Sequence, residues 1–478
     1  MGQSPRFFRR SLALLAAVAL LFFTLRHGFA PQYLGRSSAP SIDSHGHFWL
    51  DFHRILKAAA PDCKSPRRIE DHPKAIGFRP DATSNVTLPQ HIVVDKEDLE
   101  KLTKAHERLM TLLSAPSSPK LAYHPRSKGI VTTAGGSFLP VVVTSLHMLR
   151  QTGSTLPLEI FIADPSEHDA YICDSLLPTL NARCITLSDI LAYSPLAAGL
   201  KKYQFKIFAL LFSSFEDVLF LDADAFPIRD PTPLFSSEPF ASHGLVTWPD
   251  FWQVTYHPAF FNITAQDLPT GFDYASTESG QLLVSKKSHG KMLLLSAYYN
   301  FYGPSHYYPL LSQGHPGEGD KETFIPPARI LNLPFYPVST GPAVLGYRKH
   351  DGQWEGGVIM QASPTWDFKQ PKGHFAGWRD KPRAPPESFL TCHANLPKLE
   401  PIGVFGDKGL AWSKDRRPQR MWGSARDIAN QVGHDMERHL WIALGATACD
   451  LEGQFKPWQG KPKLCATIKK FIVDMEGQ

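Results

Sequence analysis

Two aspartates, Asp222 and Asp224, directly follow an apolar run, Val218 to Leu221, that predicts a buried strand. Carboxylates are costly to bury unpaired, so a pair at the carboxyl end of a strand usually faces a crevice where a hard cation can neutralise both charges. In open α/β sheets, ligands bind in that crevice. A metal held by two carboxylates keeps positions open for water and phosphate oxygens, and a nucleoside diphosphate fits this requirement.

Two other interpretations of the pair stay open. The aspartates could cap a loop or pair with lysines, because two aspartates alone are a weak motif. A phosphatase of the haloacid dehalogenase type also has Asp-x-Asp-x-Thr or Val after an apolar strand, but the last position here is Phe226. That motif normally stands near the start of its domain, whereas about 100 residues of globular composition precede it here.

The neighbouring sequence predicts the elements that position the pair. Residues 203–215 are apolar on most faces and predict a buried helix that leads into the strand, and three prolines between residues 227 and 233 predict a loop after it. Upstream, residues 129–136, 138–150 and 158–163 predict a strand, a helix and a second strand. We therefore expect an α/β fold with a mixed, mostly parallel sheet.

Several residues at these predicted strand ends are candidates for binding a nucleotide cofactor or donor. Gly135 and Gly136 would let a ligand approach the backbone, or they form only a tight turn. Asp164 follows the second strand and could meet a base or a ribose. Lys206 could add positive charge beside a diphosphate, or it is a helix-surface lysine that reaches solvent.

A second group of residues could bind the acceptor. Sugar rings stack on aromatic faces, so Trp248 and Trp252, with Asp250 between them, are candidate acceptor ligands, although tryptophans more commonly belong to a core. Gln281, just before another apolar strand, is a further candidate.

Three carboxylates are candidates for the catalytic region. Glu278 precedes the strand that contains Gln281, and Glu318 and Asp320 lie in a glycine-rich polar loop between apolar helices. Carboxylates accept paired hydrogen bonds from sugar diols, so all three could bind hydroxyl groups of the donor or acceptor. A solvated surface loop is the alternative for the last two.

The N-terminus predicts the compartment. Residues 12–25 form an apolar run flanked by arginines on both sides. A helix of that length covers about 21 Å, short of a bilayer core of about 30 Å, but flanking arginines can snorkel. We expect a signal anchor with a cytosolic tail at 1–11; a cleaved signal peptide is the alternative, since Gly28 and Ala30 have the small-x-small form, which Pro31 disfavours. Both interpretations place the remaining chain in a secretory lumen.

Cysteines and glycosylation sequons agree with a lumenal location. The six cysteines are an even number, and their spacing predicts disulfides Cys173–Cys184 and Cys449–Cys465. Cys63 and Cys392 would form a long-range pair or stay free. The Asn-x-Thr tripeptides at Asn85 and Asn262 predict glycosylation sites, though such tripeptides are common by chance.

Size and charge exclude some classes of function. The formal net charge is +5, from 50 basic and 45 acidic residues, without a dense basic block outside the N-terminal tail, so nucleic acid is not an expected partner. The expected organisation is a stem with a small helical subregion at 26–124, then one large catalytic domain at 125–478 with a C-terminal extension.

Ordered sequence blocks between about residues 125 and 400 resemble a known family. They are YQFK from Tyr203, SSFEDVLFLDAD, WPDFW from Trp248, ESGQLLV, GEGDKETF and CHAN from Cys392. The set resembles the fungal Golgi α-mannosyltransferases of glycosyltransferase family 71, in particular the α-1,2-mannosyltransferases that start branches on N-glycan outer chains. One departure is Ala223-Asp224-Ala225, where the family more often has Ser-Asp-Asn, but both carboxylates are kept.

This resemblance implies a GT-A fold, a single-pass type II protein of the Golgi membrane, GDP-mannose as donor and Mn²⁺ as cofactor. It also implies retention of anomeric configuration, a mannose-containing glycan acceptor, and association with other mannosyltransferases. Asp222 and Asp224 would hold Mn²⁺, and His393 of the CHAN block would complete the site, because neutral imidazole suits this borderline cation; a histidine that only bonds the backbone is the alternative. An α-1,3 linkage and a lumenal glycan-binding protein without turnover also stay open.

Overall fold

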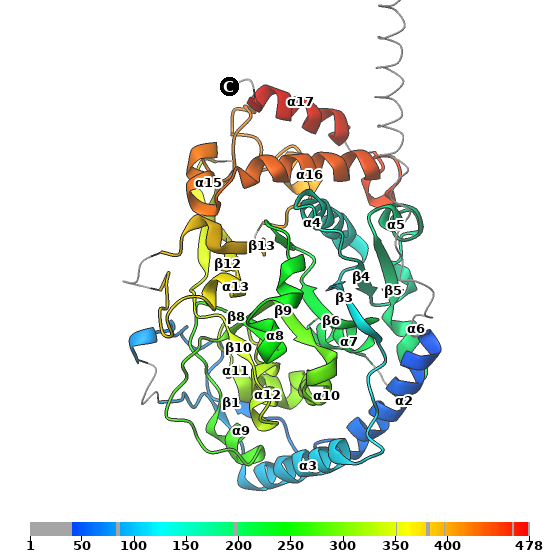
Figure 1. The fold of residues 1–478 in the computed structure, drawn as a ribbon, viewed down its shortest axis with the longest axis vertical. Coiled ribbons are helices and arrows are strands. Elements are labelled where there is room, and N and C mark those ends of the chain that lie inside the picture. Colours follow the sequence, from blue (N-terminus) through cyan, green and yellow to red (C-terminus); the bar gives the residue numbers. More distant parts are fainter. Residues whose placement is uncertain are drawn as a thin grey trace, which may run out of the picture. The chain divides into compact units, whose positions relative to one another are not determined.

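A seven-stranded mixed sheet forms the centre of the molecule (Figure 1). The strand order is β10-β8-β9-β6-β3-β4-β5; β5, β4, β3 and β6 are mutually parallel, and β9 runs antiparallel to both β6 and β8. The α/β class and the mixed sheet agree with the sequence prediction. Its strands are β3 (His124–Thr133), β4 (Leu158–Ile162), β5 (Ala182–Thr186), β6 (Phe215–Leu221), β8 (Leu245–Pro249), β9 (Thr277–Ser285) and β10 (Tyr336–Pro337).

The computed structural model describes residues 41–82, 87–194, 199–201, 203–349, 351–378, 383–395, 397–460 and 463–476. The predicted anchor at 12–25 and the sequon residue Asn85 lie outside these ranges. Within them, no helix combines the length and apolar character that a membrane crossing requires.

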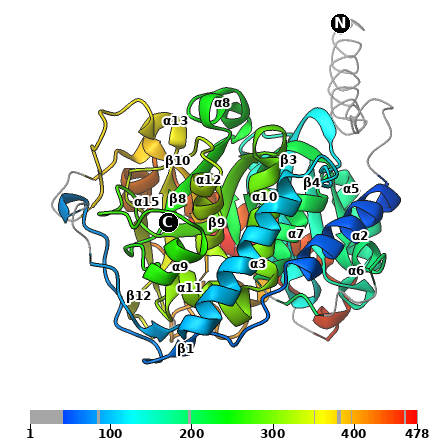
Figure 2. The same ribbon diagram turned by 90° about the horizontal axis from the view of Figure 1, so that it is seen from below.

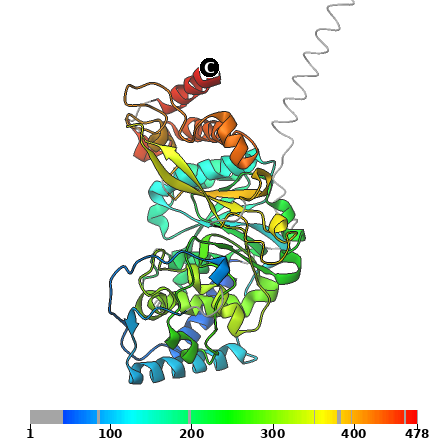
Figure 3. The same cartoon turned by 90° about the vertical axis from the view of Figure 1, so that its left-hand side faces the viewer.

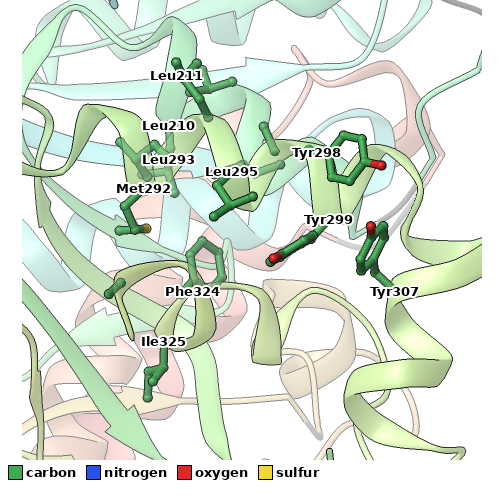
Figure 4. Close-up of a cluster of buried hydrophobic side chains, with 14 of the residues drawn as sticks. Leu210, Leu211, Met292, Leu293, Leu295, Tyr298, Tyr299, Tyr307, Phe324 and Ile325 are labelled. Atoms are coloured by element: carbon green, nitrogen blue, oxygen red, sulfur yellow. The ribbon is translucent and has the colours of Figure 1, made fainter. Parts of the chain in front are cut away.

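Helices cover both faces of the sheet, because side chains alternate along each strand. Ile130 and Leu219 pack with helix α4 (Leu139–Gln151) on one face. Val131 and Phe220 belong to the core on the other face, which includes helices α7 (Gln204–Phe212) and α10 (Lys286–Phe301). Figure 4 shows part of this second core, where leucines of α7 and α10 lie near Phe324 and the tyrosines of α10.

The two N-terminal helices belong to the same second core. They are α2 (Ile42–Ala58) and α3 (Lys96–Ser114), and they extend across the side of the molecule that contains α10 (Figure 2). Trp49 of α2 is fully buried, and its ring centre lies 5.5 Å from that of Phe208 on α7. The described residues from 41 to 476 belong to one compact unit, so the helices before residue 125 are part of the same body as the central sheet.

A smaller antiparallel sheet brings a distant segment to the end of β6. Its order is β11-β12-β13-β7, from β7 (Ala225–Pro227), β11 (Ala343–Arg348), β12 (Trp354–Ala362) and β13 (Phe389–His393). Strand β7 begins directly after Asp224, and its pairing with β13 places Ala225 opposite His393. Helix α16 (Met436–Leu451) packs on α4, and α17 (Leu464–Glu476) covers α16 at the far end of the molecule (Figure 3).

Short elements connect these layers. The two-residue strands β1 (Arg67–Arg68) and β2 (Ile92–Val93) pair with each other. The remaining helices are α5 (Leu177–Thr179), α6 (Leu187–Leu191), α8 (Phe240–His243), α9 (Pro258–Ile263), α11 (Tyr308–Ser312), α12 (Ile325–Ile330), α13 (Pro364–Asp367), α14 (Pro401–Phe405) and α15 (Ala425–Val432).

The cysteines pair as their spacing predicts. Disulfides join Cys173 to Cys184 and Cys449 to Cys465, and the second one links α16 to α17. Cys63 and Cys392 are free thiols.

Candidate active site

Asp222, Asp224 and His393 form one cluster at the carboxyl end of β6. One ligand atom from each lies within 4.8 Å of the other two. Asp224 and His393 are brought together because β7 turns back from the end of β6 and pairs with β13. The side chain of Asp222 is 29% exposed, against 6% for Asp224, so the cluster opens to solvent at Asp222.

His393 is held between two carboxylates. Its Nδ1 lies 3.0 Å from Glu278 Oε1 and its Nε2 lies 3.3 Å from Asp224 Oδ1. Glu278 Oε1 also accepts from the backbone N–H of Gly280, at 2.8 Å. A Cβ on Gly280 would lie 2.5 Å from the imidazole Nδ1, so only glycine leaves room for the ring there. Glu278 therefore orients His393 and is not free to bind a sugar hydroxyl through Oε1.

The charges of this cluster shift each other's pKa values. Burial alone would lower the pKa of His393, but Glu278 and Asp224 raise it well above its usual value. Burial would raise the pKa of Asp224, but the hydrogen bond and charge of His393, together with the Lys398 ammonium, lower it to about 2. The pKa of Asp222 is raised, because burial outweighs the attraction of Lys206 and His393. The surroundings of Asp222 thus disfavour its charged form relative to an aspartate in water.

These residues fit a divalent cation. Two carboxylates and an imidazole are a suitable donor set for Mn²⁺. The raised pKa of Asp222 indicates a carboxylate that a further positive charge would stabilise. Glu278 Oε2 is buried, with no hydrogen-bond partner in the described part of the chain, next to the histidine that would be the third ligand. Metal-ligating histidines usually bond a carboxylate through their second nitrogen, as His393 does to Glu278.

Lys206 joins one further carboxylate, Asp320, to the cluster. Its ammonium lies 3.4 Å from Asp222 and 3.1 Å from Asp320, and it donates to the Ser279 carbonyl at 2.5 Å. The side chain is 7% exposed, so the alternative of a surface lysine is wrong. Burial lowers the pKa of Lys206, but Asp222 and Asp320 more than compensate and raise it, so the group stays charged. Lys206 fixes the loop that carries Asp320 against the end of β6.

Lys398 is a site residue that the sequence reasoning missed. Its ammonium contacts Asp224 Oδ2, and its side chain is 41% exposed. It stands five residues after His393, on the segment between β13 and α14. The lysine five residues beyond a predicted metal-binding histidine was a signal that could have identified it.

The aromatic block does not present both tryptophans to an acceptor sugar, as the sequence analysis expected it to. Trp248 is 1% exposed, and its indole N–H donates to the Ala362 carbonyl at 2.8 Å, so it is a core residue that links the two sheets. Asp250 pairs with Lys321 at 2.9 Å. Trp252 is half-buried and lines a cavity of about 10 Å³ beside Lys321. Trp248 therefore packs the fold, and the charges of Asp250 and Lys321 compensate each other. Acceptor binding by Trp252 stays a prediction.

Gln281 is also a buried residue. It is 1% exposed, and its Oε1 accepts from the Thr391 hydroxyl of β13. Its Nε2 has no partner within the described ranges. Gln281 therefore joins β9 to β13 and does not face an open acceptor site.

Glu318 lies apart from the cluster. Its carboxylate pairs with Arg68 of β1 and accepts from the Gly314 N–H at 2.6 Å. The ion pair holds the loop against the N-terminal segment. Glu318 therefore has a structural role that requires no bound ligand. Of the three carboxylates predicted to bind hydroxyls, only Asp320 contacts Lys206 directly, whereas Glu278 reaches the cluster through His393.

The candidate nucleotide ligands lie at the ends of β3 and β4. Gly136 has a φ of +53°, a conformation that favours glycine, and a Cβ there would meet nothing within 4 Å. A Cβ on Gly135 would lie 2.0 Å from Glu167 Oε2, so this glycine makes room for a side chain of the protein itself. Asp164 is exposed and accepts from the N–H and hydroxyl of Ser166. The sequon residue Asn262 is exposed on α9, and its glycosylation stays a prediction.

The ligand-binding edge of this α/β sheet thus carries carboxylates, an imidazole, one buried ammonium group and one partly exposed ammonium group. The chain belongs to the mannosyltransferase family Mannosyl_trans3, whose model matches residues 127–275 and 266–365. This confirms the family expected from the ordered blocks.

Curated relatives are fungal mannosyltransferases. Alpha-1,2-mannosyltransferase MNN21 of Candida albicans is 33% identical over 451 residues, covering 81% of this chain and 67% of the relative. Alpha-1,2-mannosyltransferase MNN2 of Saccharomyces cerevisiae is 36% identical over 341 residues, covering 63% of this chain and 56% of the relative. The chain thus spans between half and about two thirds of the length of these relatives.

Solved structures with some likeness include glycosyltransferases of low sequence identity. The galactosyltransferase LgtC is 15% identical, with a TM-score of 0.29, and the match covers 44% of this chain and 73% of that chain. Mouse xyloside xylosyltransferase 1 is 14% identical, with a TM-score of 0.30, and the match covers 44% of this chain and 84% of that chain.

Proposed function

We propose that this protein transfers mannose from GDP-mannose to a mannose hydroxyl of a glycan, forms an α-1,2 linkage and retains the anomeric configuration. The observation that carries the proposal is the Asp222, Asp224 and His393 cluster at the end of β6, in a chain that belongs to a mannosyltransferase family. The α-1,2 linkage follows the names of the curated relatives. The mixed sheet with its parallel strands ending at this cluster supports a GT-A fold.

Each residue of the cluster has a role in this reaction. Asp222, Asp224 and His393 would hold a divalent cation, Mn²⁺ in our proposal, which supplies positive charge to the leaving diphosphate. Glu278 keeps His393 oriented with Nε2 toward Asp224, so the nitrogen is in place before a ligand arrives.

Two ammonium groups complete the electrostatic environment. Lys398 is partly exposed beside Asp224 and can donate a charge-assisted hydrogen bond to a phosphate oxygen. Lys206 is buried and already bonded, so it stabilises Asp222 and Asp320 and does not bind the ligand directly. Asp320 is 6% exposed and accepts from Lys206 at 3.1 Å, so it holds this ammonium in place.

A donor panel tests the proposal. The purified protein is incubated with GDP-mannose, UDP-galactose, UDP-glucose and UDP-N-acetylglucosamine, each with α-mannobiose as acceptor, with Mn²⁺ or with a chelator. We expect a trisaccharide only with GDP-mannose and Mn²⁺, and an α-1,2 linkage by NMR. An α-1,3 product would change the linkage, binding without turnover would indicate a lectin, and release of inorganic phosphate from p-nitrophenyl phosphate would indicate a phosphohydrolase.

We also propose that the protein is a single-pass type II protein of the Golgi membrane. The support is the arginine-flanked run at 12–25 and the two disulfides, which form in oxidising compartments. Protease added to intact microsomes should leave all but the short N-terminal tail protected, whereas a secreted product that begins near Pro31 would contradict the anchor.

A further inference from the structure

The carboxyl ends of β6, β3 and β4 form a continuous edge beside the Asp222 cluster. The three strands are parallel and adjacent, so the end of β4 lies about 10 Å from the end of β6. The chain runs outward from β3 to β4 and β5 and then returns to β6 on the other side of β3. The strand order therefore reverses between β3 and β6, and ligands of open α/β sheets bind at such a point.

Among the residues that the structure describes, the two directions along this edge differ in the room they leave for the nucleoside of a donor. On the β9 side of β6, Glu278, Gln281 and Thr391 are buried, and His393 is held by Glu278 and Asp224. On the β3 side, Gly136 faces open space, and the side chains that follow β4 are exposed or half-buried. A nucleoside joined to a diphosphate at Asp222 must therefore extend over the ends of β3 and β4.

Glu167 is the carboxylate fixed at this open end. It follows β4 by five residues, and its Oε2 accepts from the Ala163 N–H at 3.0 Å. Gly135 of the neighbouring strand segment gives it space, since any Cβ there would lie 2.0 Å from Oε2. Its Oε1 has no hydrogen-bond partner among the residues that the structure describes. The neighbouring Asp164 differs, because its Oδ1 already accepts twice from Ser166 in a local turn.

A carboxylate with a fixed position and a free oxygen selects one nucleobase. Guanine presents two adjacent donors, N1–H and the 2-amino group. Glu167 can accept one of them through the free Oε1 and the other through the second lone pair of Oε2. Uracil presents a single N–H between two carbonyl oxygens, which a carboxylate repels, and adenine has an acceptor beside its amino group. We propose that Glu167 reads the guanine base of the donor through N1–H and the 2-amino group; this inference rests on the proposed function and names the residue that sets its nucleotide specificity.

Nucleotide analogues test the assignment by binding alone. The probes are GDP, inosine diphosphate, which lacks the 2-amino group, and xanthosine diphosphate, which has a carbonyl there; all are titrated calorimetrically with Mn²⁺. The wild type should bind GDP about 10-fold or more tightly than either analogue, because each analogue loses or reverses one hydrogen bond to a charged group.

The variant Glu167→Gln keeps the shape and can still accept from Ala163 N–H, but it turns an amide toward the base. It should bind GDP about 10-fold or more weakly, lose the preference over inosine diphosphate, and gain affinity for xanthosine diphosphate. The variant Asp164→Asn tests the other carboxylate at this edge. The control is Asp174→Asn, which changes an exposed carboxylate that pairs with His168 and should keep the wild-type preferences.

Each outcome decides the assignment. Unchanged GDP preference in Glu167→Gln overturns the role of Glu167, and altered preference in Asp164→Asn moves it to Asp164. Titration with 2′-deoxy-GDP gives a further test. If Glu167→Gln no longer distinguishes GDP from 2′-deoxy-GDP but keeps its preference for GDP over inosine diphosphate, Glu167 is a ribose ligand and the proposal is overturned. Absence of any GDP binding by the wild type would instead contradict the proposed function.

Discussion

Replacing Lys398 with methionine should raise the affinity of the nucleotide-free protein for Mn²⁺ and lower its affinity for GDP once Mn²⁺ is bound. In the structure, the Lys398 ammonium contacts Asp224 Oδ2, on one of the three predicted ligands of the cation. A cation that binds Asp224 must compete with this ammonium. Once the cation is bound, the diphosphate of GDP would accept a hydrogen bond from the Lys398 ammonium. One substitution therefore has opposite effects on two successive binding steps.

The size of each effect follows from exposure. The Lys398 side chain is 41% exposed and Asp224 is 6% exposed, so solvent screens the pair and its contribution is about 1 kcal/mol, near the upper end for exposed pairs. Removing the ammonium should thus strengthen Mn²⁺ binding about fivefold. A charge-assisted hydrogen bond to a phosphate contributes about 1.5–3 kcal/mol, so GDP affinity at saturating Mn²⁺ should fall about 10- to 100-fold.

Calorimetric titration measures both steps, first with Mn²⁺ alone and then with GDP at saturating Mn²⁺. Lys408→Met is the matched control, since Lys408 is an exposed lysine on the segment after α14, and it should change neither affinity. If Lys398→Met weakens Mn²⁺ binding, or leaves GDP binding unchanged, the role of Lys398 is refuted.

Three further predictions follow from the charges of the structure. Asp222→Asn should reduce transfer about 10³-fold or more without lowering the unfolding temperature, because folding raises the pKa of this carboxyl and so disfavours its charge; a destabilised variant would contradict this. His393→Ala should raise the Mn²⁺ concentration for half-maximal activity about 10-fold or more, and an unchanged value would make His393 purely structural. Burial lowers the pKa of Lys286 to about 7, so above pH 7 the folded chain binds fewer protons than the unfolded chain. The free energy of unfolding should therefore gain up to about 1.4 kcal/mol per pH unit between pH 7 and 10 from this group. Urea unfolding at several pH values measures this gain, and an unchanged pH dependence in Lys286→Met would contradict the role of Lys286.

Local patterns predicted the strands and helices near the site well. The apolar run before Asp222 is the end of β6, and the predicted helix at 138–150 is α4 to within one residue at each end. These elements could be predicted because a buried strand and an amphipathic helix leave a periodic record in the sequence. His393 could be found only through the resemblance of its block, because nothing local distinguishes a histidine that a distant strand pairing brings to the site.

The orientation of side chains could not be predicted. Their residue types led us to predict that Trp248 and Gln281 bind the acceptor. Both lie on strands with two buried faces, so their side chains belong to the core. Glu278 meets His393 across 115 residues of sequence, and Arg68 neutralises Glu318 across 250. Such pairs depend on long-range topology, which spacing along the chain does not encode.

The burial of α2 against α7 has a consequence for recombinant expression. From the sequence, we placed the start of the large domain at residue 125, and Trp49, Phe52 and Leu56 from before that point are fully buried in the core that backs the β6 strand. A fragment that starts at 125 would expose the apolar surface that these three side chains cover, and it would remove the Arg68 partner of Glu318. The shortest soluble enzyme should therefore begin before Ile42.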